Sequence, residues 1–394
     1  MMERFGFYKW FTGLVIAAVL AGLGGCQDEA GDAAPKQSFM NVGQFSVTKK
    51  EGYTEVLDGA GRKLALIPRG GKAPEGFSPS SVVEVPVQRV VAYRAFEVGI
   101  LAALGVADTL VGVTDPLERW QRDDVRQGFN AGRIAYVGQS TNVDFERIKA
   151  QRPDLVMTWD PSIIPMLDSL GIPAVVTTTP VASCLNTHMR FVEFIAPFFG
   201  REAEGQAYYA KVAAALQDIR ERTKGMPQPK VMWGDIYEKR VLVEPGNAWV
   251  AELIGLAQSD YLFNDIYGTS CIEISTERFI HSGKDADLYF TYRTPDRGAT
   301  SKAALARYNP LIAQIRPLGP EGHVYAPLPL YIQSSDRLDQ ILVDISAILH
   351  PQAFPQHKMQ FFVELPDTDP KNDASPGETQ RTSEKARQVG GTES

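Results

Sequence analysis

Aromatic residues recur where predicted strands end. In chain order they are Tyr93, Trp159, Trp233 and Tyr292. Ligands of open parallel sheets bind beyond the carboxyl ends of the strands, so these four side chains are predicted to face one binding cleft. Packing in the core or at the rim is the alternative for any one of them, as for most aromatic residues. Tyr237 and Tyr331 could add flat apolar surface against a large organic ligand.

Two arginines lie beside these aromatic residues. Arg94 follows the first predicted strand, and Arg293 directly follows Tyr292. A guanidinium group forms paired, charge-assisted hydrogen bonds with carboxylate, catecholate or phosphate oxygens. This mixture favours an anionic ferric-siderophore complex, while haem with a tyrosine as axial ligand and a corrinoid stay open. The alternative for each arginine is a surface ion pair, because acids are near in the sequence: Asp115, Glu118 and Asp296.

The sequence has none of the common catalytic motifs. It contains no Gly-x-Ser-x-Gly elbow, no glycine-rich phosphate loop with a lysine and no His-Glu-x-x-His. Cys184 and His188 are four residues apart, yet both fall at the start of a predicted helix and nothing supplies an oxyanion site. The five histidines lie far apart, which disfavours a zinc site. We therefore expect no catalytic residues, no metal site and no bound cofactor.

Two segments of the chain repeat each other. Residues 144–148 (DFERI) match residues 275–279 (STERF), and a similar apolar segment follows each copy. The first residue of each segment, Asp or Ser, is a good N-cap. Glu146 and Glu277 then fall in the first turn of a helix, where the helix dipole favours an acid. The repeat predicts two similar lobes around a cleft. Compensation of the dipole alone is the alternative role for each glutamate.

The N-terminus has the features of a lipoprotein signal. Two basic residues precede the apolar run 11–23, which is too short for a comfortable membrane span. The run ends in Leu-Gly-Gly-Cys, which looks like a lipobox, and the thiol of Cys26 would receive the lipid. An uncleaved anchor with an incidental cysteine is the alternative. Export implies a compartment that permits disulfides, so Cys184 and Cys271 could pair.

Composition and periodicity predict an α/β protein. The net charge of −7 and the pI near 5.4 argue against a nucleic-acid partner. Strands and helices alternate from Pro86 onward, which predicts two Rossmann-like lobes with parallel sheets, separated by a long helical stretch interrupted near Phe199-Gly200. The predicted parts are a signal peptide (1–25), a tether (26–38), a β-rich segment (39–85), an N-terminal lobe (86–186), an interlobe helix (187–225), a C-terminal lobe (226–351) and a mostly disordered tail (352–394).

Several short stretches occur in a characteristic order. They are RVVAY from 89, ILAALGV from 100, LVGV from 110, VG from 137, FERI from 145 and RPDLV from 152. From residue 86 to 351 the chain resembles the substrate-binding proteins of iron-siderophore, haem and vitamin B12 importers, whose lobes are joined by one long helix. In that family one glutamate at the top of each lobe docks onto arginines of the permease. By position these match Glu146 and Glu277. The segment 39–85 lies outside the family's common core.

The resemblance implies a lipoprotein that captures a small metal complex for an ABC importer. A ferric siderophore is the first choice of ligand, haem or cobalamin the second, and a structural envelope lipoprotein is a further alternative. The expected partners are the ABC permease subunits and a membrane that holds the lipid anchor, with no nucleic acid. We expect an exported monomer, in the periplasm or on the outer face of a membrane.

Overall fold

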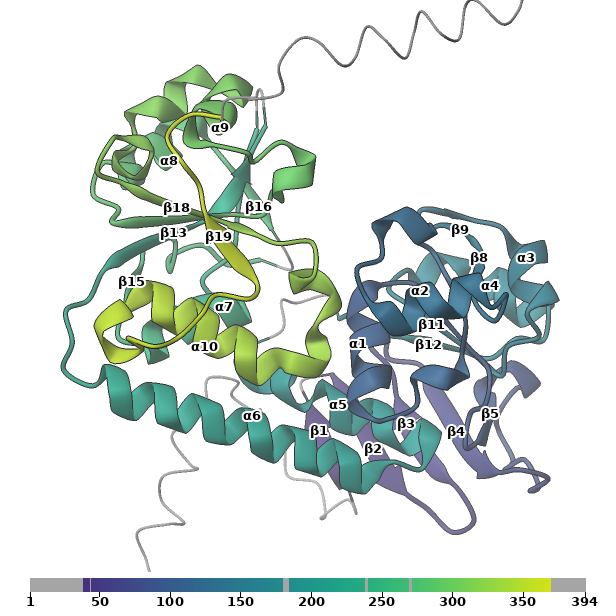
Figure 1. Cartoon of the computed structure of the whole chain (residues 1–394). Helices are drawn as coiled ribbons and strands as arrows, with labels where there is room; N and C mark the ends of the chain where they lie inside the picture. Colours follow the sequence, from purple (N-terminus) through teal and green to yellow (C-terminus); the bar gives the residue numbers. More distant parts are fainter. Residues whose placement is uncertain (1–37, 43, 180–183, 238–239, 269–270, 370–394) are drawn as a thin grey trace, which may run out of the picture.

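The computed structural model describes residues 38–369, apart from residues 43, 180–183, 238–239 and 269–270. The predicted signal peptide, Cys26 and almost all of the tether lie outside the described residues, as does the tail from residue 370 onward. Two lobes lie side by side above the long helix α6 (Glu202–Thr223), and a separate small sheet lies under the N-terminal lobe (Figure 1). Within the described ranges, none of the helices combines the length and apolarity that crossing a bilayer requires.

The N-terminal lobe is built on a parallel sheet with the strand order β12-β11-β6-β7-β8. Its strands are β6 (Val90–Ala92), β7 (Leu110–Val113), β8 (Ala135–Tyr136), β11 (Leu155–Thr158) and β12 (Ala174–Val176). Its helices are α1 (Ala95–Ala103), α2 (Asp123–Asn130), α3 (Phe145–Ala150) and α4 (Ile164–Ser169), with a small antiparallel pair of β9 (Gly138–Gln139) and β10 (Asn142–Val143). Every residue of β6, β7, β11 and β12 is buried, as expected for parallel strands covered on both faces. The predicted parallel sheet is confirmed.

Two helices connect the lobes. Helix α5 covers Leu185–Phe199, and α6 follows after a short break. Gly200 in the break has a φ of 64°, a left-handed conformation that glycine adopts without a steric penalty and that ends α5. The buried residues of α6 recur at helical spacing, so one stripe of the helix faces the protein and the rest faces solvent. The interruption predicted near Phe199-Gly200 is therefore present, and the helical stretch begins at Leu185.

The C-terminal lobe has a mixed sheet with the order β16-β14-β13-β17-β18-β19, and β15 pairs beside β13. Its strands are β13 (Lys230–Ile236), β14 (Val241–Val243), β15 (Asp260–Tyr261), β16 (Ile272–Ile274), β17 (Leu288–Thr291), β18 (His323–Pro327) and β19 (Phe362–Glu364). Its helices are α7 (Trp249–Leu256), α8 (Thr276–Gly283), α9 (Lys302–Tyr308) and α10 (Leu338–Leu349). The strands β13, β17 and β18 are parallel, so their carboxyl ends share one edge of the sheet.

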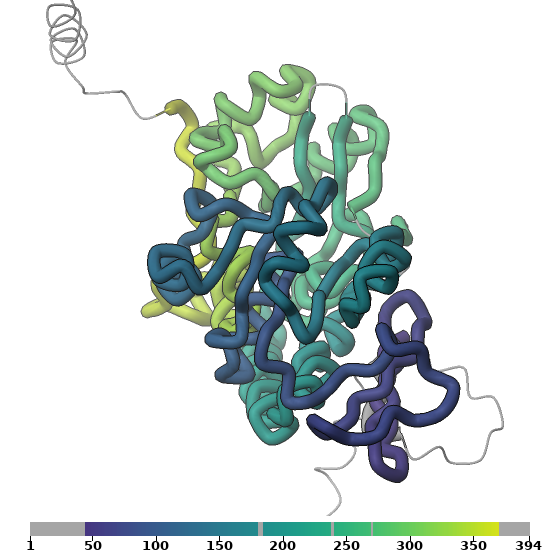
Figure 2. The backbone as a smooth tube through the Cα atoms, turned by 90° about the vertical axis from the view of Figure 1, so that its right-hand side faces the viewer, coloured from purple at the N-terminus to yellow at the C-terminus, as the bar shows by residue number. Residues whose placement is uncertain are grey.

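The β-rich N-terminal segment forms a sheet of its own. Its strands, in spatial as well as chain order, are β1 (Ser38–Val42), β2 (Phe45–Lys49), β3 (Thr54–Leu57), β4 (Lys63–Pro68) and β5 (Val82–Val85). The Phe45 ring packs on Phe194 of α5 with a centroid distance of 4.6 Å. The fully buried carboxylate of Asp58 accepts a hydrogen bond from the backbone N–H of Val176 in β12 at 3.1 Å. These contacts fix the sheet, drawn in purple in Figure 2, to α5 and the N-terminal lobe.

The first part of the predicted tail is not disordered, which corrects the expectation for residues 352–369. Strand β19 pairs antiparallel with β18, and the side chains of Phe361, Phe362 and Leu365 are buried. Lys302 of α9 binds the Asp367 carboxylate at 2.8 Å. The expectation extended the polar character of residues 365–394 to the apolar residues just before them, whose burial against the C-terminal lobe stabilises the ordered chain. Residues 370–394 lie outside the described part.

Candidate functional site

Tyr93 and Trp159 come directly after the adjacent strands β6 and β11. Tyr93 is 2% exposed, and its buried hydroxyl has no hydrogen-bond partner among the described residues. Burial raises the pKa of Tyr93, and the nearby charge of Asp160 adds to this, so the hydroxyl is a neutral donor. Trp159 is half-buried and packs against apolar residues of the same lobe. The structure brings these two predicted site residues together.

Arg94 follows Tyr93 and is held by an acid of its own helix. Its Nε donates to the Glu97 carboxylate at 2.8 Å, and its backbone N–H donates to the same group at 2.7 Å. The Thr177 hydroxyl donates to Glu97 as well, at 2.6 Å. The Glu97 side chain is fully buried, whereas that of Arg94 is 36% exposed. Arg94 therefore forms an ion pair, as the alternative interpretation predicted, but its partner is Glu97 and not one of the acids proposed from the sequence.

Trp233 lies in the core of the C-terminal lobe. It is 1% exposed and stacks on Phe290 of the neighbouring strand with a centroid distance of 4.5 Å. The edge of Phe362 packs against the same ring. The prediction that Trp233 faces a cleft is thus replaced by the core alternative, because β13 is central in the sheet and both its faces are covered. Its indole N–H is buried and lacks a partner within the described ranges.

Arg293, at the end of β17, is also paired. Its guanidinium lies 3.3 Å from the Asp235 carboxylate and donates to the carbonyl oxygen of Ile236 at 3.0 Å. It also lies over the Tyr308 ring, 4.0 Å from the centroid, and 5.2 Å from that of Tyr237. The side chains of Arg293 and Asp235 are 13% and 9% exposed. Burial raises the pKa of Asp235, and Arg293 opposes that shift.

Tyr292 and Tyr331 share the surroundings of a carboxyl group that the sequence had not singled out, that of Glu244. The Tyr292 hydroxyl is buried and makes no well-formed hydrogen bond with any described residue. Burial raises the pKa of Glu244, and Tyr292 partly offsets this. Burial and then the charge of Glu244 raise the pKa of both tyrosines. The Cys271 thiol, also with a raised pKa, lies at the exposed side of the cluster. Hydrogen-bonding groups gather here without enough partners.

Direct contacts between the lobes join the two halves of this site. The short turns η9 (Tyr331–Gln333) and η10 (Ser335–Arg337) pack against α1. The Ser335 hydroxyl donates to the carbonyl of Phe96 at 2.9 Å, and Arg122 pairs with Asp336 at 2.8 Å. Tyr331, from the C-terminal side, is thereby placed against the helix that begins next to Arg94. Tyr237, 42% exposed, lies on the solvent side of Arg293.

Cys184 and His188 lie at the start of α5 and contact different residues. The His188 ring stacks parallel to that of Trp249 in α7 at 4.6 Å, where α5 meets the C-terminal lobe. Burial and then the positive charge of Arg94 lower the pKa of His188 to about 4. Cys271 is a free thiol, so the disulfide between Cys184 and Cys271 that export would permit is not formed in this structure.

Glu146 and Glu277 occupy equivalent positions in α3 and α8. The N-cap side chains of the two helices each accept a hydrogen bond from the backbone N–H three residues on, at 3.0 and 3.1 Å. Both glutamates are exposed and form no ion pair with a described residue. The next residue of each helix, an arginine, is already paired with an aspartate. Figure 1 shows both helices on the sides of the lobes that face away from α6.

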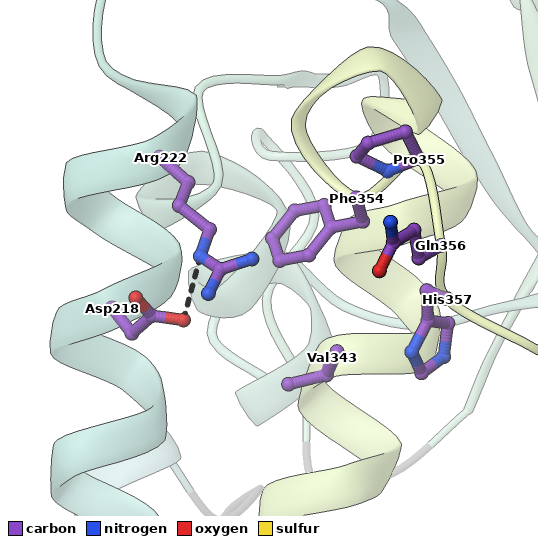
Figure 3. A pocket seen from close by; sticks show the side chains of 7 residues that line it. All are labelled: Asp218, Arg222, Val343, Phe354, Pro355, Gln356 and His357. Carbon is purple, nitrogen blue, oxygen red and sulfur yellow. Dashed lines mark ion pairs between the residues drawn. The ribbon is translucent and has the colours of Figure 1, made fainter.

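Two other pockets lie away from these strand ends. One of about 430 Å³ lies between α6 and the segment after α10 (Figure 3). In it Arg222 pairs with Asp218 at 2.8 Å and lies over the Phe354 ring, so its charge is already balanced. A second pocket of about 720 Å³ lies where β17 and β18 begin. No group of three or more His, Cys, Asp or Glu residues suited to a metal ion occurs in the described part of the chain.

Sequence reasoning missed the acids of this site. Asp235 lies at the end of β13, Glu244 directly follows β14, and Glu97 lies in the first turn of α1. For Asp235 the signal was available, because an acid at the end of a parallel strand lies at the same edge of the sheet as the residues that follow its parallel neighbours. Glu244 gave no such signal, because β14 runs antiparallel to β13. What was lacking was the pairing of strands across the sheet. It places Asp235 beside Arg293, 58 positions apart in the chain.

Two α/β lobes linked by a long helix, with polar and aromatic residues at their strand ends, define the class of two-lobed ligand-binding proteins. The model of the family described as periplasmic binding protein matches residues 90–326, more than half of the chain. The chain belongs to this family.

Individual relatives agree with this assignment. A lipoprotein of Methanocaldococcus jannaschii is 25% identical over 79% of this chain and 78% of its own length. The vitamin B12-binding protein of Vibrio campbellii is 22% identical over 48% of this chain and 66% of its own length. The crystal structure of a periplasmic haem-binding protein from Pseudomonas aeruginosa has a TM-score of 0.58 at 19% identity, covering 72% of this chain and 99% of that one. The structural likeness shows the two-lobed fold.

Proposed function

We propose that the chain is the substrate-binding lipoprotein of an ABC importer and that it holds a metal complex of an organic ligand, a ferric siderophore in the first place, between its lobes. The observation that carries this is a buried, unpartnered tyrosine hydroxyl at the strand ends of each lobe, Tyr93 and Tyr292. A buried polar group without a partner costs about 1–3 kcal/mol. A ligand seated between the lobes would supply the missing hydrogen bonds.

Haem and cobalamin are the alternative ligands. They are supported by the names of two similar proteins, one haem-binding and one vitamin B12-binding. Both of those ligands are metal complexes of large flat macrocycles, which half-buried aromatic side chains such as Trp159 and Tyr331 would suit.

Intact-mass analysis under native conditions, on protein extracted from its source, tests the proposal directly. A bound metal complex adds a defined mass that disappears on unfolding. With the ligand identified, re-addition at a hundred times its Kd stabilises the protein by about 2.7 kcal/mol. Absence of any bound species, together with an unchanged melting temperature across ferric siderophores, haem and cobalamin, would favour a structural envelope lipoprotein.

We further propose that Cys26 carries the lipid and that Glu146 and Glu277 dock onto the permease. The exposed, unpaired state of both glutamates supports the docking role, because each acid is free to meet a basic partner. Cys26→Ser should leave an unprocessed precursor and abolish metabolic labelling with palmitate. Equal labelling of the variant and the unmodified protein would contradict the anchor.

A further inference from the structure

The charged groups at the strand ends contain more acid than base. Among the described residues there, Arg94 is paired with Glu97 and Arg293 with Asp235. Asp160, next to Trp159, and Glu244 form no ion pair with a described residue. Together these residues are two arginines and four acids, so the acids outnumber the bases. The arginines that would attract an anion are therefore balanced within the protein itself.

The geometry of Arg293 leaves it little freedom to serve a ligand. The Asp235 carboxylate lies at 3.3 and 3.4 Å from two of its nitrogens, and the Ile236 carbonyl accepts a third contact at 3.0 Å. The two rings of Tyr308 and Tyr237 enclose the guanidinium. An anion that drew Arg293 away would leave Asp235 almost buried and unpaired, and breaking such a pair is strongly unfavourable.

The neighbouring cluster offers acceptors as well as donors. The backbone of Glu244 is fixed between Trp233, whose carbonyl accepts its N–H at 3.1 Å, and Tyr261, whose hydroxyl donates to the Glu244 carbonyl at 2.7 Å. Its carboxyl group lies beside the buried Tyr292 hydroxyl in a poorly solvated place. Charge interactions strengthen as solvent is excluded, so a second negative charge brought close to this carboxylate is repelled.

From these contacts we infer that the ligand is a neutral or positively charged metal complex whose periphery donates hydrogen bonds, such as amide, hydroxyl or ammonium groups, and not a polyanion. This inference rests on the proposed function and narrows it. A ferric trihydroxamate or an uncharged corrinoid fits the charge balance. A ferric tricatecholate, which carries three negative charges, does not, and haem with its two propionates fits less well. The anionic siderophore favoured from the arginines alone is thereby replaced.

A titration with matched complexes tests this inference. Tryptophan fluorescence of the full exported protein is followed with a ferric trihydroxamate that bears an ammonium group, an uncharged ferric trihydroxamate, a ferric tricatecholate, haem and cyanocobalamin. We expect at least one neutral or cationic complex to bind ten times or more tighter than the tricatecholate and haem. Tightest binding of the tricatecholate or haem would overturn the inference while supporting the proposed function. Binding of none of the five would count against the proposed function itself.

Two variants test whether the unpaired acids set the charge preference for the ligand. Glu244→Gln and Asp160→Asn each remove a negative charge at nearly constant shape, and each should narrow the preference for a cationic over an anionic complex several-fold. Glu146→Gln, an exposed acid of α3, is the matched control and should leave the preference unchanged. If neither site variant alters the preference while both keep the melting temperature of the unmodified protein, the acids do not set the ligand's charge.

Discussion

The arginines at the strand ends and the glutamates in the first turns of α3 and α8 differ in whether they have partners. Arg94 and Arg293 are each bound by a carboxylate that is 0% or 9% exposed. Glu146 and Glu277 are exposed and unpaired among the described residues. A paired, enclosed charge holds the local backbone in place, whereas an exposed and unpaired one is available to a second molecule. Under the proposed function, the difference separates residues that support the ligand site from residues that dock onto the permease.

The largest effect is expected on transport. Glu146→Ala combined with Glu277→Ala should lower uptake at least tenfold, because two interfacial charge pairs would be lost and the register of docking with them. Ligand affinity and melting temperature should remain near those of the unmodified protein. Asp123→Ala, which removes an exposed acid from the first turn of α2, is the control for uptake assays in cells. Normal uptake by the double variant would reduce both glutamates to dipole compensation.

On the enclosed side, Glu97→Ala should be the most destabilising change. It removes a fully buried carboxylate to which both the guanidinium and the backbone N–H of Arg94 donate. Breaking a buried pair costs about 3–5 kcal/mol, and the partial exposure of Arg94 favours the lower end, about 3 kcal/mol. Urea unfolding gives the free energy. Glu146→Ala is the control, and its free energy of unfolding should change by no more than about 0.5 kcal/mol. An equally small change for Glu97→Ala would contradict the contrast between the two regions.

Stability should also fall on acidification because of His188. Its pKa is lowered to about 4 in the folded protein from an ordinary value of 6.5. The unfolded chain therefore takes up the proton first, so stability is full above pH 6.5, decreases as the pH falls to 4 and is level below. We expect a loss of about 3 kcal/mol from this group. His188→Phe retains a ring against Trp249, and its unfolding free energy should depend less on pH across that window. An identical pH profile would refute this.

The smallest effect on stability is expected for Tyr292→Phe. Its hydroxyl makes no well-formed hydrogen bond within the described ranges, so removing it should leave the free energy of unfolding unchanged or slightly raised. Tyr261→Phe is the matched control and should cost about 1 kcal/mol, because that hydroxyl donates to the Glu244 carbonyl at 2.7 Å. If the Tyr292 hydroxyl serves the ligand, Tyr292→Phe should instead weaken ligand binding. Equal destabilisation by both variants would show that Tyr292 has a structural partner.

Local patterns predicted much of the fold. Helix α3 begins directly after the predicted N-cap aspartate of residues 144–148, because a capping side chain acts over a few residues. The end of α5 was foreseen from Gly200 for the same reason. Strand β19 was missed, since a stretch of three residues becomes a strand only when the edge of β18 is available for pairing.

The sequence by itself determined that Tyr93, Trp159 and Tyr292 follow strands, that the chain has two similar lobes, and that each lobe has one acid in the first turn of an equivalent helix. These follow from periodicity, capping and repetition, all of which are local or internal to the chain. Only the tertiary structure decided which of the strand-end residues are free. The pairing of Arg293 with Asp235, the burial of Trp233 and the position of Glu244 beside Tyr292 depend on which strands become neighbours. A charged side chain that pairs with another residue of the protein is no longer available to a ligand. Which charges stay available therefore depends on how the strands pack.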